Sequence, residues 1–260
     1  MSTKKFTHAI VRVPGRSISN GLLSSTYLEG RPNYEKAIVH HEQNVAALAK
    51  AGMDVTILPA CEDFPSSIFI EDNALLTDNV AILSSPGAPT RRGEINIPDL
   101  VPTLRKFYDH IERITEGTVE PGDIMMVGND YYIGVSHRTS RAGAEQMASI
   151  LKKYGHNPHL VEVKDTLHLK TGVNYLENNN LLISGEFIDN PIFKDFNKIP
   201  IPEDEMYAAN CVWVNDYVLV PEGYPKVKKI VEDLGYTPLV VGCSELRKTN
   251  GGLSCISLRF

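Results

Sequence analysis

Four stretches of the chain repeat one pattern, in which two short apolar segments flank a turn rich in Asp and Asn. Because Asn and Asp adopt the left-handed backbone conformations that tight turns need, each stretch predicts a β-hairpin. The stretches are IEDNALLTDNVAILS from Ile70, EPGDIMMVGNDYYIGVS from Glu120, KTGVNYLENNNLLISGE from Lys170 and AANCVWVNDYVLVPE from Ala208, with turns near residues 78, 129, 178 and 215. Such self-similarity is typical of folds built from stacked or circular repeats.

Helical patterns lie between the hairpins. Apolar residues recur at helical spacing over 34–51, 141–154 and 224–234, and the last two patterns end at a glycine. FTHAIVRVP near the start and GGLSCISLRF at the end are interpreted as strands that complete further copies. Strand pairs that alternate with helices indicate a mixed α/β fold. About five units predict a closed, propeller-like ring with helices outside, formed as one domain by residues 1–260.

The composition argues against several classes of function. The 260 residues carry a formal net charge of −6 and contain no basic block, which argues against nucleic acid as a partner. No secretory signal and no run of about 18 apolar residues occurs, so we expect no membrane span and a cytoplasmic location. The four cysteines are scattered, so disulfides are not expected, and no His or Cys spacing completes a tetrahedral metal site.

Two connections are irregular. Residues 14–33 are rich in Gly and Ser, and we expect a mobile surface loop or a lid there, since long loops inside compact domains are often functional. Residues 84–98 form a second connection, rich in Gly and Pro, that carries Arg91 and Arg92. Neither segment resembles an interdomain linker, because the hairpin pattern continues across both.

Polar residues interrupt the apolar pattern at four places. Glu71 and Asp72 are adjacent carboxylates inside an apolar strand of SIFIEDNALL. They lie either at a strand end that turns into solvent or in a cavity that binds a cation such as a guanidinium. Glu120, which Pro121 and Gly122 follow, is either a solvated turn carboxylate or a side chain that a bulge directs inward.

The other two interruptions are a histidine and a cysteine. His168 precedes its hairpin as Glu120 does, and it is either a satisfied core residue or an acid–base group. Cys255, on the expected C-terminal strand, follows Gly251 and Gly252, which permit a close approach of the backbone to a ligand. A cysteine there can be a nucleophile if its thiolate is stabilised. Each signal alone is weak, but their recurrence at similar positions in a ring of repeats favours one shared site.

The motifs around these residues resemble a known family. FIED, GTVEPGDIMMVG, LHLKTG, YLENNNLL, YAANCVWVN and GGLSCISLRF resemble the dimethylarginine dimethylaminohydrolase (dimethylargininase) family of the pentein superfamily, in order and over essentially the whole chain. The resemblance implies a five-fold pseudosymmetric α/β propeller. It also implies hydrolysis of Nω-methylated arginine to citrulline and a methylamine through a covalent thiouronium on cysteine, with no metal or organic cofactor.

By position, the resemblance makes Cys255 the nucleophile and His168 the general acid and base. Glu120 and Asp72 then hold the guanidinium of a small substrate. The further substrate contacts that it implies are Leu22, Glu71, Arg91, Arg138 and Thr249, of which the two arginines bind the substrate carboxylate. Residues 14–33 become a lid over the site, and since family members are often dimers, a homodimer is expected.

One position departs from the family pattern. The family reads roughly Phe-Pro-Asp-Ser ahead of the Glu-Asp pair, whereas this chain has FPSSIFIED with Ser66. In the family that aspartate helps to anchor the α-amino group of the substrate. Ser66 supplies a hydrogen bond but no charge, which costs about 1–2 kcal/mol of binding if nothing compensates. A guanidino compound with a modified or absent α-amine is therefore an alternative substrate.

Three other functions stay open as alternatives. Arginine deiminase uses similar roles on unmethylated arginine, but its members generally carry an extra helical insertion for which this chain has no room. An arginine–glycine-type amidinotransferase is disfavoured by length for the same reason. A non-catalytic guanidinium-binding module is disfavoured because every reactive position is present, namely Asp72, Glu120, His168 and Cys255.

Overall fold

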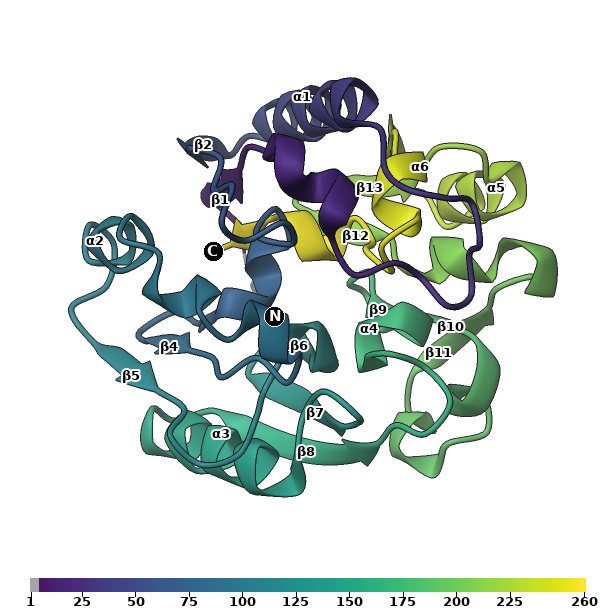
Figure 1. The fold of residues 1–260 in the computed structure, drawn as a ribbon. Helices are drawn as coiled ribbons and strands as arrows, with labels where there is room; N and C mark the ends of the chain where they lie inside the picture. Colours follow the sequence, from purple (N-terminus) through teal and green to yellow (C-terminus); the bar gives the residue numbers. More distant parts are fainter. Residues whose placement is uncertain (1–4) are drawn as a thin grey trace.

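Five small sheets surround a common centre in the computed structural model, which describes residues 5–260 (Figure 1). Each of these sheets has three strands, with an antiparallel pair on one side of the middle strand and a parallel pair on the other. The five-fold, propeller-like α/β ring that the repeats and the family resemblance predict is confirmed.

The four predicted hairpins each begin one sheet. In each, the third strand follows a crossover connection and pairs in parallel with the second strand of the hairpin. In chain order the strands are β3 (Ala74–Leu76), β4 (Ala81–Leu83), β5 (Ile111–Arg113), β6 (Ile124–Val127), β7 (Asp130–Val135), β8 (Asn157–Glu162), β9 (Val173–Tyr175), β10 (Asn180–Ile183), β11 (Asn197–Pro200), β12 (Val212–Val214), β13 (Tyr217–Pro221) and β14 (Thr237–Val241).

Asparagines form two of the hairpin turns in the left-handed conformation. Asn178 and Asn179 have φ of 50° and 65°, and Asn215 has φ of 54°. The side chain of Asn215 also bonds to the backbone of Phe6 in both directions, and it donates to the carbonyl of Ala51. The turn of one repeat is thus tied to the neighbouring sheet, and the turn prediction at both places is confirmed.

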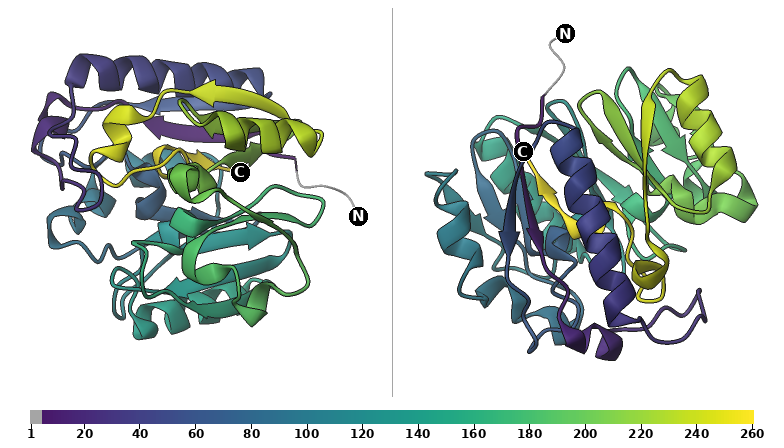
Figure 2. Two further views of the ribbon diagram at one scale, coloured as in Figure 1. Left: turned by 90° about the vertical axis from the view of Figure 1, so that its right-hand side faces the viewer. Right: turned by 90° about the horizontal axis from the view of Figure 1, so that it is seen from above.

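The two ends of the chain build the fifth sheet together. Strand β1 (His8–Arg12) lies between β15 (Leu258–Arg259), with which it pairs antiparallel, and β2 (Asp54–Leu58), with which it pairs in parallel. The carbonyl of Phe260 accepts hydrogen bonds from the backbone N–H groups of Thr7 and His8. This pairing closes the ring (Figure 2) and explains why the last residues are apolar.

Helices cover the outside of the ring (Figure 1). The α-helices of residues 5–260 are α1 (Tyr34–Lys50), α2 (Leu100–Leu104), α3 (Arg141–Lys153), α4 (Leu169–Gly172), α5 (Pro225–Asp233) and α6 (Ser244–Arg247). The short α4 is an exception to the outer position and lies near the centre. The side chains of Asn33 and Ser140 cap α1 and α3 by accepting backbone N–H bonds. Each long helix buries one apolar stripe against its sheet, as Leu48, Met147 and Val227 do.

Two strand predictions at the centre of the ring were wrong. Cys255 lies in the 3-10 turn η9 (Ser254–Ile256) rather than on a strand, and Glu71 with Asp72 lies in the 3-10 turn η2 (Ile70–Asn73). The physical reason is visible at Ser254, whose N–H donates to Asn210 Oδ1 and whose hydroxyl donates to Glu71. Polar groups here bind side chains of other repeats instead of a neighbouring strand.

Residues 5–260 contain no helix with both the length and the apolar character that a membrane crossing requires.

Candidate active site

A short helical turn precedes the first strand of each hairpin at the centre of the ring, and another precedes β15. These turns are η2, η5 (Pro121–Asp123), α4, η8 (Glu203–Ala209) and η9. Each carries or adjoins one polar side chain at an equivalent place in its repeat: Asp72, Glu120, His168, Asn210 and Cys255. The quasi-symmetry of the fold therefore brings side chains that are far apart in sequence to one point.

One cavity collects nearly every predicted site residue. It is lined by Leu22, Ser66, Phe69, Asp72, Arg91, Glu120, Arg138, Leu167, His168, Thr249, Asn250, Gly251 and Cys255, and we call it the guanidinium cavity. Leu22 comes from residues 14–33, the segment predicted to be a lid. Glu71 is the one predicted site residue that does not line this cavity.

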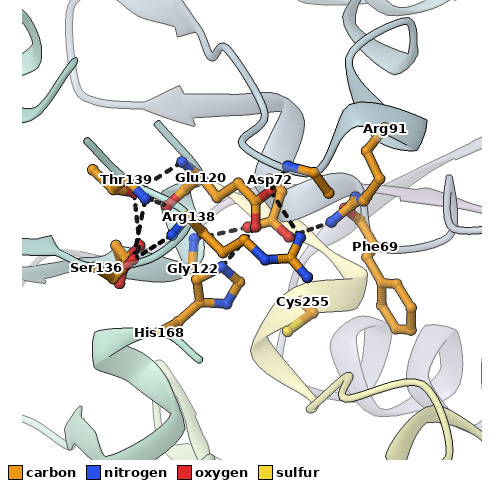
Figure 3. A network of polar contacts seen from close by, with 12 residues as sticks. Phe69, Asp72, Arg91, Glu120, Gly122, Ser136, Arg138, Thr139, His168 and Cys255 are labelled. Carbon is orange, nitrogen blue, oxygen red and sulfur yellow. Dashed lines mark hydrogen bonds and ion pairs between the residues drawn. The ribbon is translucent and has the colours of Figure 1, made fainter. Parts of the chain in front are cut away.

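His168 and Glu120 form a buried pair. Nε2 of His168 lies 2.7 Å from Oε2 of Glu120 (Figure 3). The other oxygen, Oε1, accepts the backbone N–H of Ala88 at 3.0 Å and Nη1 of Arg138 at 3.3 Å. The carboxylate is therefore fixed from both sides and orients the imidazole.

The two partners shift each other's pKa in opposite directions. Burial favours the neutral forms, but the hydrogen bond and charge of His168 hold the pKa of Glu120 at about 2. Burial likewise opposes the charge on His168, and the nearby carboxylates of Asp123, Asp72 and Glu120 raise the pKa of the imidazole to about 9. At neutral pH the pair is therefore a carboxylate and an imidazolium.

Asp72 is held between an arginine and a backbone amide. Arg91 donates from Nη1 to Oδ2 of Asp72 at 2.6 Å, and the N–H of Gly122 donates to Oδ1 at 2.9 Å (Figure 3). Arg91 is itself buried and also binds Glu94 and the carbonyl of Phe69. These contacts fix the Asp72 carboxylate at the wall of the cavity.

Cys255 carries a neutral thiol in this arrangement. Burial raises the pKa of the thiol to about 12, and the charges of Glu71 and Asp72 act in the same direction. The N–H of Gly252, 3.4 Å from Sγ, and the charge of Lys170 oppose this shift. A cation in the cavity would therefore be needed for the thiolate to form at neutral pH.

Glu71 faces away from the guanidinium cavity. Its Oε1 pairs with Nζ of Lys170 at 2.6 Å and with Nη2 of Arg259 at 3.3 Å, and its Oε2 accepts the hydroxyl of Ser254. Neighbouring residues of a 3-10 turn point about 120° apart, and here Asp72 faces the cavity whereas Glu71 points to Lys170 and Arg259. Glu71 instead supports the turn that carries Cys255.

Gly251 and Gly252 are required because the backbone packs closely against other side chains, whether or not a ligand is bound. A Cβ on Gly251 would lie 2.1 Å from the ring of Phe69, and one on Gly252 would lie 2.5 Å from Oδ1 of Asn210. Neither glycine has a positive φ; Asn250 before them does, at 60°. The backbone before Cys255 is thus pressed against two side chains that shape the site.

Asn210 was missed by the sequence analysis. Its Nδ2 donates to the carbonyl of Lys170 and to the hydroxyl of Ser254, while its Oδ1 accepts the N–H of Ser254. It joins three repeats next to Cys255. The signal that could have found it is its position directly before an apolar strand in YAANCVWVN, which matches that of Asp72, Glu120 and His168 in their repeats.

Three side chains at the centre have the geometry to hold a cation. One potential ligand atom each from Asp72, Glu120 and His168 lies within 4.8 Å of the others. In this structure, however, these groups already bind one another, Arg91 and the N–H of Gly122. Two fixed carboxylates are a suitable receptor for the N–H groups of a guanidinium, which is planar and offers several donors.

Comparisons with known proteins agree with this geometry. A family model described as arginine deiminase matches residues 35–216. The N(G),N(G)-dimethylarginine dimethylaminohydrolase of Pseudomonas aeruginosa is 50% identical, over 98% of this chain and 100% of that relative. The chain belongs to the dimethylarginine dimethylaminohydrolase family. The Streptomyces coelicolor protein of the same name is 29% identical over 100% of this chain and 98% of its own length.

A solved structure gives the same assignment, and a more distant one shares the fold. The dimethylarginine dimethylaminohydrolase of Pseudomonas aeruginosa, as a cysteine-to-serine mutant in complex with citrulline, superposes with a TM-score of 0.95 at 48% identity and covers 99% of this chain and 100% of that chain. The N-terminal domain of a cyanobacterial arginine dihydrolase has a TM-score of 0.86 at 16% identity, with 97% of each chain covered. The latter likeness shows the shared fold alone.

Proposed function

We propose that this protein hydrolyses the guanidino group of Nω-methylated arginine to citrulline and a methylamine. The observation that carries the proposal is the convergence of a cysteine thiol, an imidazolium–carboxylate pair and a second fixed carboxylate on one cavity. The membership of the chain in the dimethylarginine dimethylaminohydrolase family supports it.

The substrate itself activates the nucleophile in this mechanism. A guanidinium held by Asp72 and Glu120 places its positive charge beside Cys255, which offsets the negative charges that keep the thiol protonated. The thiol proton leaves to solvent, and the thiolate attacks the central carbon of the guanidinium. The carboxylates fix this carbon within attack distance and favour the cationic, electrophilic form.

His168 then handles the protons of both half-reactions. Its imidazolium donates a proton to the departing methylamine as the carbon–nitrogen bond breaks, which leaves a thiouronium on Cys255. The neutral imidazole next removes a proton from the water that attacks this carbon. Citrulline leaves as the carbon–sulfur bond breaks, and Cys255 returns to its starting state. Glu120 keeps the imidazole oriented throughout and stabilises its charge.

The two arginines have different places in this scheme. Arg138 is partly exposed and reaches across the cavity to Glu120 (Figure 3), so an incoming guanidinium displaces it and it becomes free to bind the substrate carboxylate. Arg91 is fully buried between Asp72 and Glu94, and it chiefly keeps the Asp72 carboxylate in place. Leu22, Ser66 and Thr249 contact the remainder of the substrate.

A substrate panel tests the proposal. Citrulline is measured with arginine, monomethylarginine, asymmetric dimethylarginine and a des-amino analogue of the last. Rapid turnover of the methylated arginines supports the proposal. Turnover of arginine alone replaces it with an arginine deiminase, turnover of the des-amino compound alone changes the substrate, and binding without turnover of any compound indicates a guanidinium-binding module.

Ser66→Asp should strengthen the binding of substrates that carry an α-amino group. Ser66 is buried at the cavity wall and supplies no charge. A carboxylate there should lower KM for asymmetric dimethylarginine by about 5- to 30-fold, which corresponds to a charged hydrogen bond of about 1–2 kcal/mol. KM for the des-amino analogue should not fall. Equal changes with both substrates would contradict this role of position 66.

Gly122→Ala should impair turnover without unfolding the protein. A Cβ at this position would lie 2.7 Å from Nδ1 of His168 and 3.0 Å from Oδ1 of Asp72, so one or both side chains must move. A displacement of this size should lower kcat/KM about 100-fold. Thermal unfolding of the variant serves as the control for folding. Unchanged kinetics would show that the position of the imidazole is not critical.

Three further expectations stay predictions: one domain over residues 1–260, assembly as a homodimer and a cytoplasmic location.

A further inference from the structure

A second cavity adjoins the guanidinium cavity at Cys255 and His168. Its lining includes Tyr27, Thr171, Met206, Tyr207, Asn210 and Gly252, and we call it the second cavity. Leu167, His168, Asn250, Gly251 and Cys255 line both cavities. The nucleophile and the acid–base residue therefore stand where the two spaces meet.

The two cavities differ in size and in chemistry. With Arg138 bound to Glu120, the guanidinium cavity has a volume of about 30 Å³, whereas the second cavity has about 250 Å³. Carboxylates and arginines line the first. Side chains with large apolar surfaces, among them Tyr27, Met206 and Tyr207, line much of the second, and Lys170 at its wall is already paired with Glu71.

The chemistry of a methylated guanidinium determines which of its nitrogens faces the guanidinium cavity and which faces the second cavity. A nitrogen that carries two methyl groups has no N–H to donate, so a carboxylate such as Asp72 or Glu120 gains nothing by binding it. The unsubstituted nitrogens are the ones that pair with the carboxylates. The substituted nitrogen is also the one that leaves, and it must lie near the imidazole of His168, where the two cavities meet. Because the unsubstituted nitrogens occupy the side lined by carboxylates, the substituted nitrogen faces the second cavity.

We propose that the second cavity receives the Nω-substituents of the substrate and then the released amine, and that Met206 sets the largest substituent accepted. This proposal rests on the proposed function. The water of the second half-reaction enters from the same cavity, because it must reach the same face of the thiouronium and the same imidazole once the amine has gone.

Met206 is the adjustable part of the wall. Tyr207 is fixed, because its hydroxyl donates to the carbonyl of Gly251 at 2.8 Å and its ring stacks on Tyr224 with centroids 5.5 Å apart. Tyr27, from the segment that forms the predicted lid, makes an edge contact with Tyr207 at 5.7 Å. Met206 is half-buried, and its unbranched side chain can change rotamer to fit a bound group.

The test compares Nω-monomethyl-, Nω-propyl- and Nω-benzylarginine as substrates of the purified wild-type enzyme and of two variants. Met206→Trp should lower kcat/KM for the propyl compound at least about 10-fold relative to the monomethyl compound, which is the scale of a small misfit in an apolar pocket. Met206→Ala should raise the relative kcat/KM for the benzyl compound about 10-fold. Met126→Ala, at a methionine outside both cavities, should leave these ratios unchanged.

Turnover of the monomethyl compound distinguishes failure of the proposed function from failure of the proposal about the second cavity. If it is turned over and the ratios shift as stated, the inference is supported. If it is turned over but neither Met206 variant changes the ratios beyond Met126→Ala, the substituents do not enter the second cavity and the inference is overturned, while the proposed function stands. If the wild type turns over none of the three compounds and does not turn over asymmetric dimethylarginine either, the proposed function fails and the inference fails with it.

Discussion

Cys255→Ser should lower citrulline formation from asymmetric dimethylarginine by at least about 10⁴-fold. A serine hydroxyl at this place would have to form an alkoxide within reach of Glu71 and Asp72, whose charges already oppose the thiolate. A guanidinium is resonance-stabilised, so a neutral hydroxyl is too weak a nucleophile to attack it. Binding should be retained, because Asp72, Glu120 and Arg138, which hold the substrate, are unchanged.

The measurement combines citrulline formation with the ligand-induced shift in melting temperature. Cys61→Ser is the matched control, since Cys61 is a free, half-buried cysteine outside the guanidinium cavity. The control should keep wild-type kinetics, and Cys255→Ser should keep the melting shift while it loses activity. Substantial activity in Cys255→Ser would show that the reaction does not pass through this thiol.

The second large effect is expected for His168→Gln, which should lower kcat by about 10²- to 10⁴-fold. Glutamine can keep a hydrogen bond to Glu120 but cannot give a proton to the amine or take one from water. The dependence of kcat/KM on pH tests specifically whether His168 acts as the proton donor. The pKa of His168 is raised to about 9, so the imidazolium is present below that pH and is lost above it. In the wild type kcat/KM should therefore fall as pH rises through about 9.

This fall in kcat/KM at high pH, the high-pH limb of the profile, should be absent from His168→Gln. His159→Gln is the control, because His159 is a half-exposed histidine on β8 that binds Asp130 and lies outside both cavities. It should reproduce the wild-type profile. A high-pH limb that persists in His168→Gln would assign the titration to another group and contradict the acid–base role of His168.

The shifted pKa values of His168 and Glu120 also make the stability of the folded protein depend on pH. The raised pKa of His168 contributes stability that is fully present below its ordinary pKa of about 6.5 and is lost as pH rises through about 9. The lowered pKa of Glu120 contributes stability that is present above its ordinary pKa of about 4.5 and is lost as pH falls through about 2. The full contribution of the pair to stability is therefore present between about pH 4.5 and 6.5, although both groups stay charged in the folded protein over a wider range.

Much of this fold could be predicted from local patterns. The turn and the two strands of each hairpin lie in one continuous stretch of sequence, so they can be recognised locally. The left-handed turn at Asn215 is an example. The fifth sheet was harder, because its strands come from opposite ends of the chain. The 3-10 turns at the centre could not be distinguished from strands, since a short apolar run around Asp72 or Cys255 fits both.

In the site, too, the residues with a local sequence signal could be predicted and those without one could not. His168, Glu120 and Cys255 stood out because polar side chains interrupt apolar segments there. Asn210 did not, since an asparagine before a strand is also an ordinary turn residue. Glu71 faces away from the cavity because its 3-10 turn directs it toward Lys170 and Arg259, and neither the turn nor these partners could be predicted from the sequence. The pairing of Arg91 with Asp72 had no local signal either, because the two residues lie 19 positions apart and meet only through the irregular connection that follows β4.

The most direct test of the central claim is the mass of Cys255 during turnover. Wild-type enzyme is mixed with asymmetric dimethylarginine, quenched in acid within one turnover, digested, and its Cys255 peptide is weighed. We predict an added mass equal to that of the substrate less dimethylamine, absent from Cys255→Ser and from the Cys61 peptide. Release of citrulline with no such adduct at any quench time would contradict the covalent mechanism.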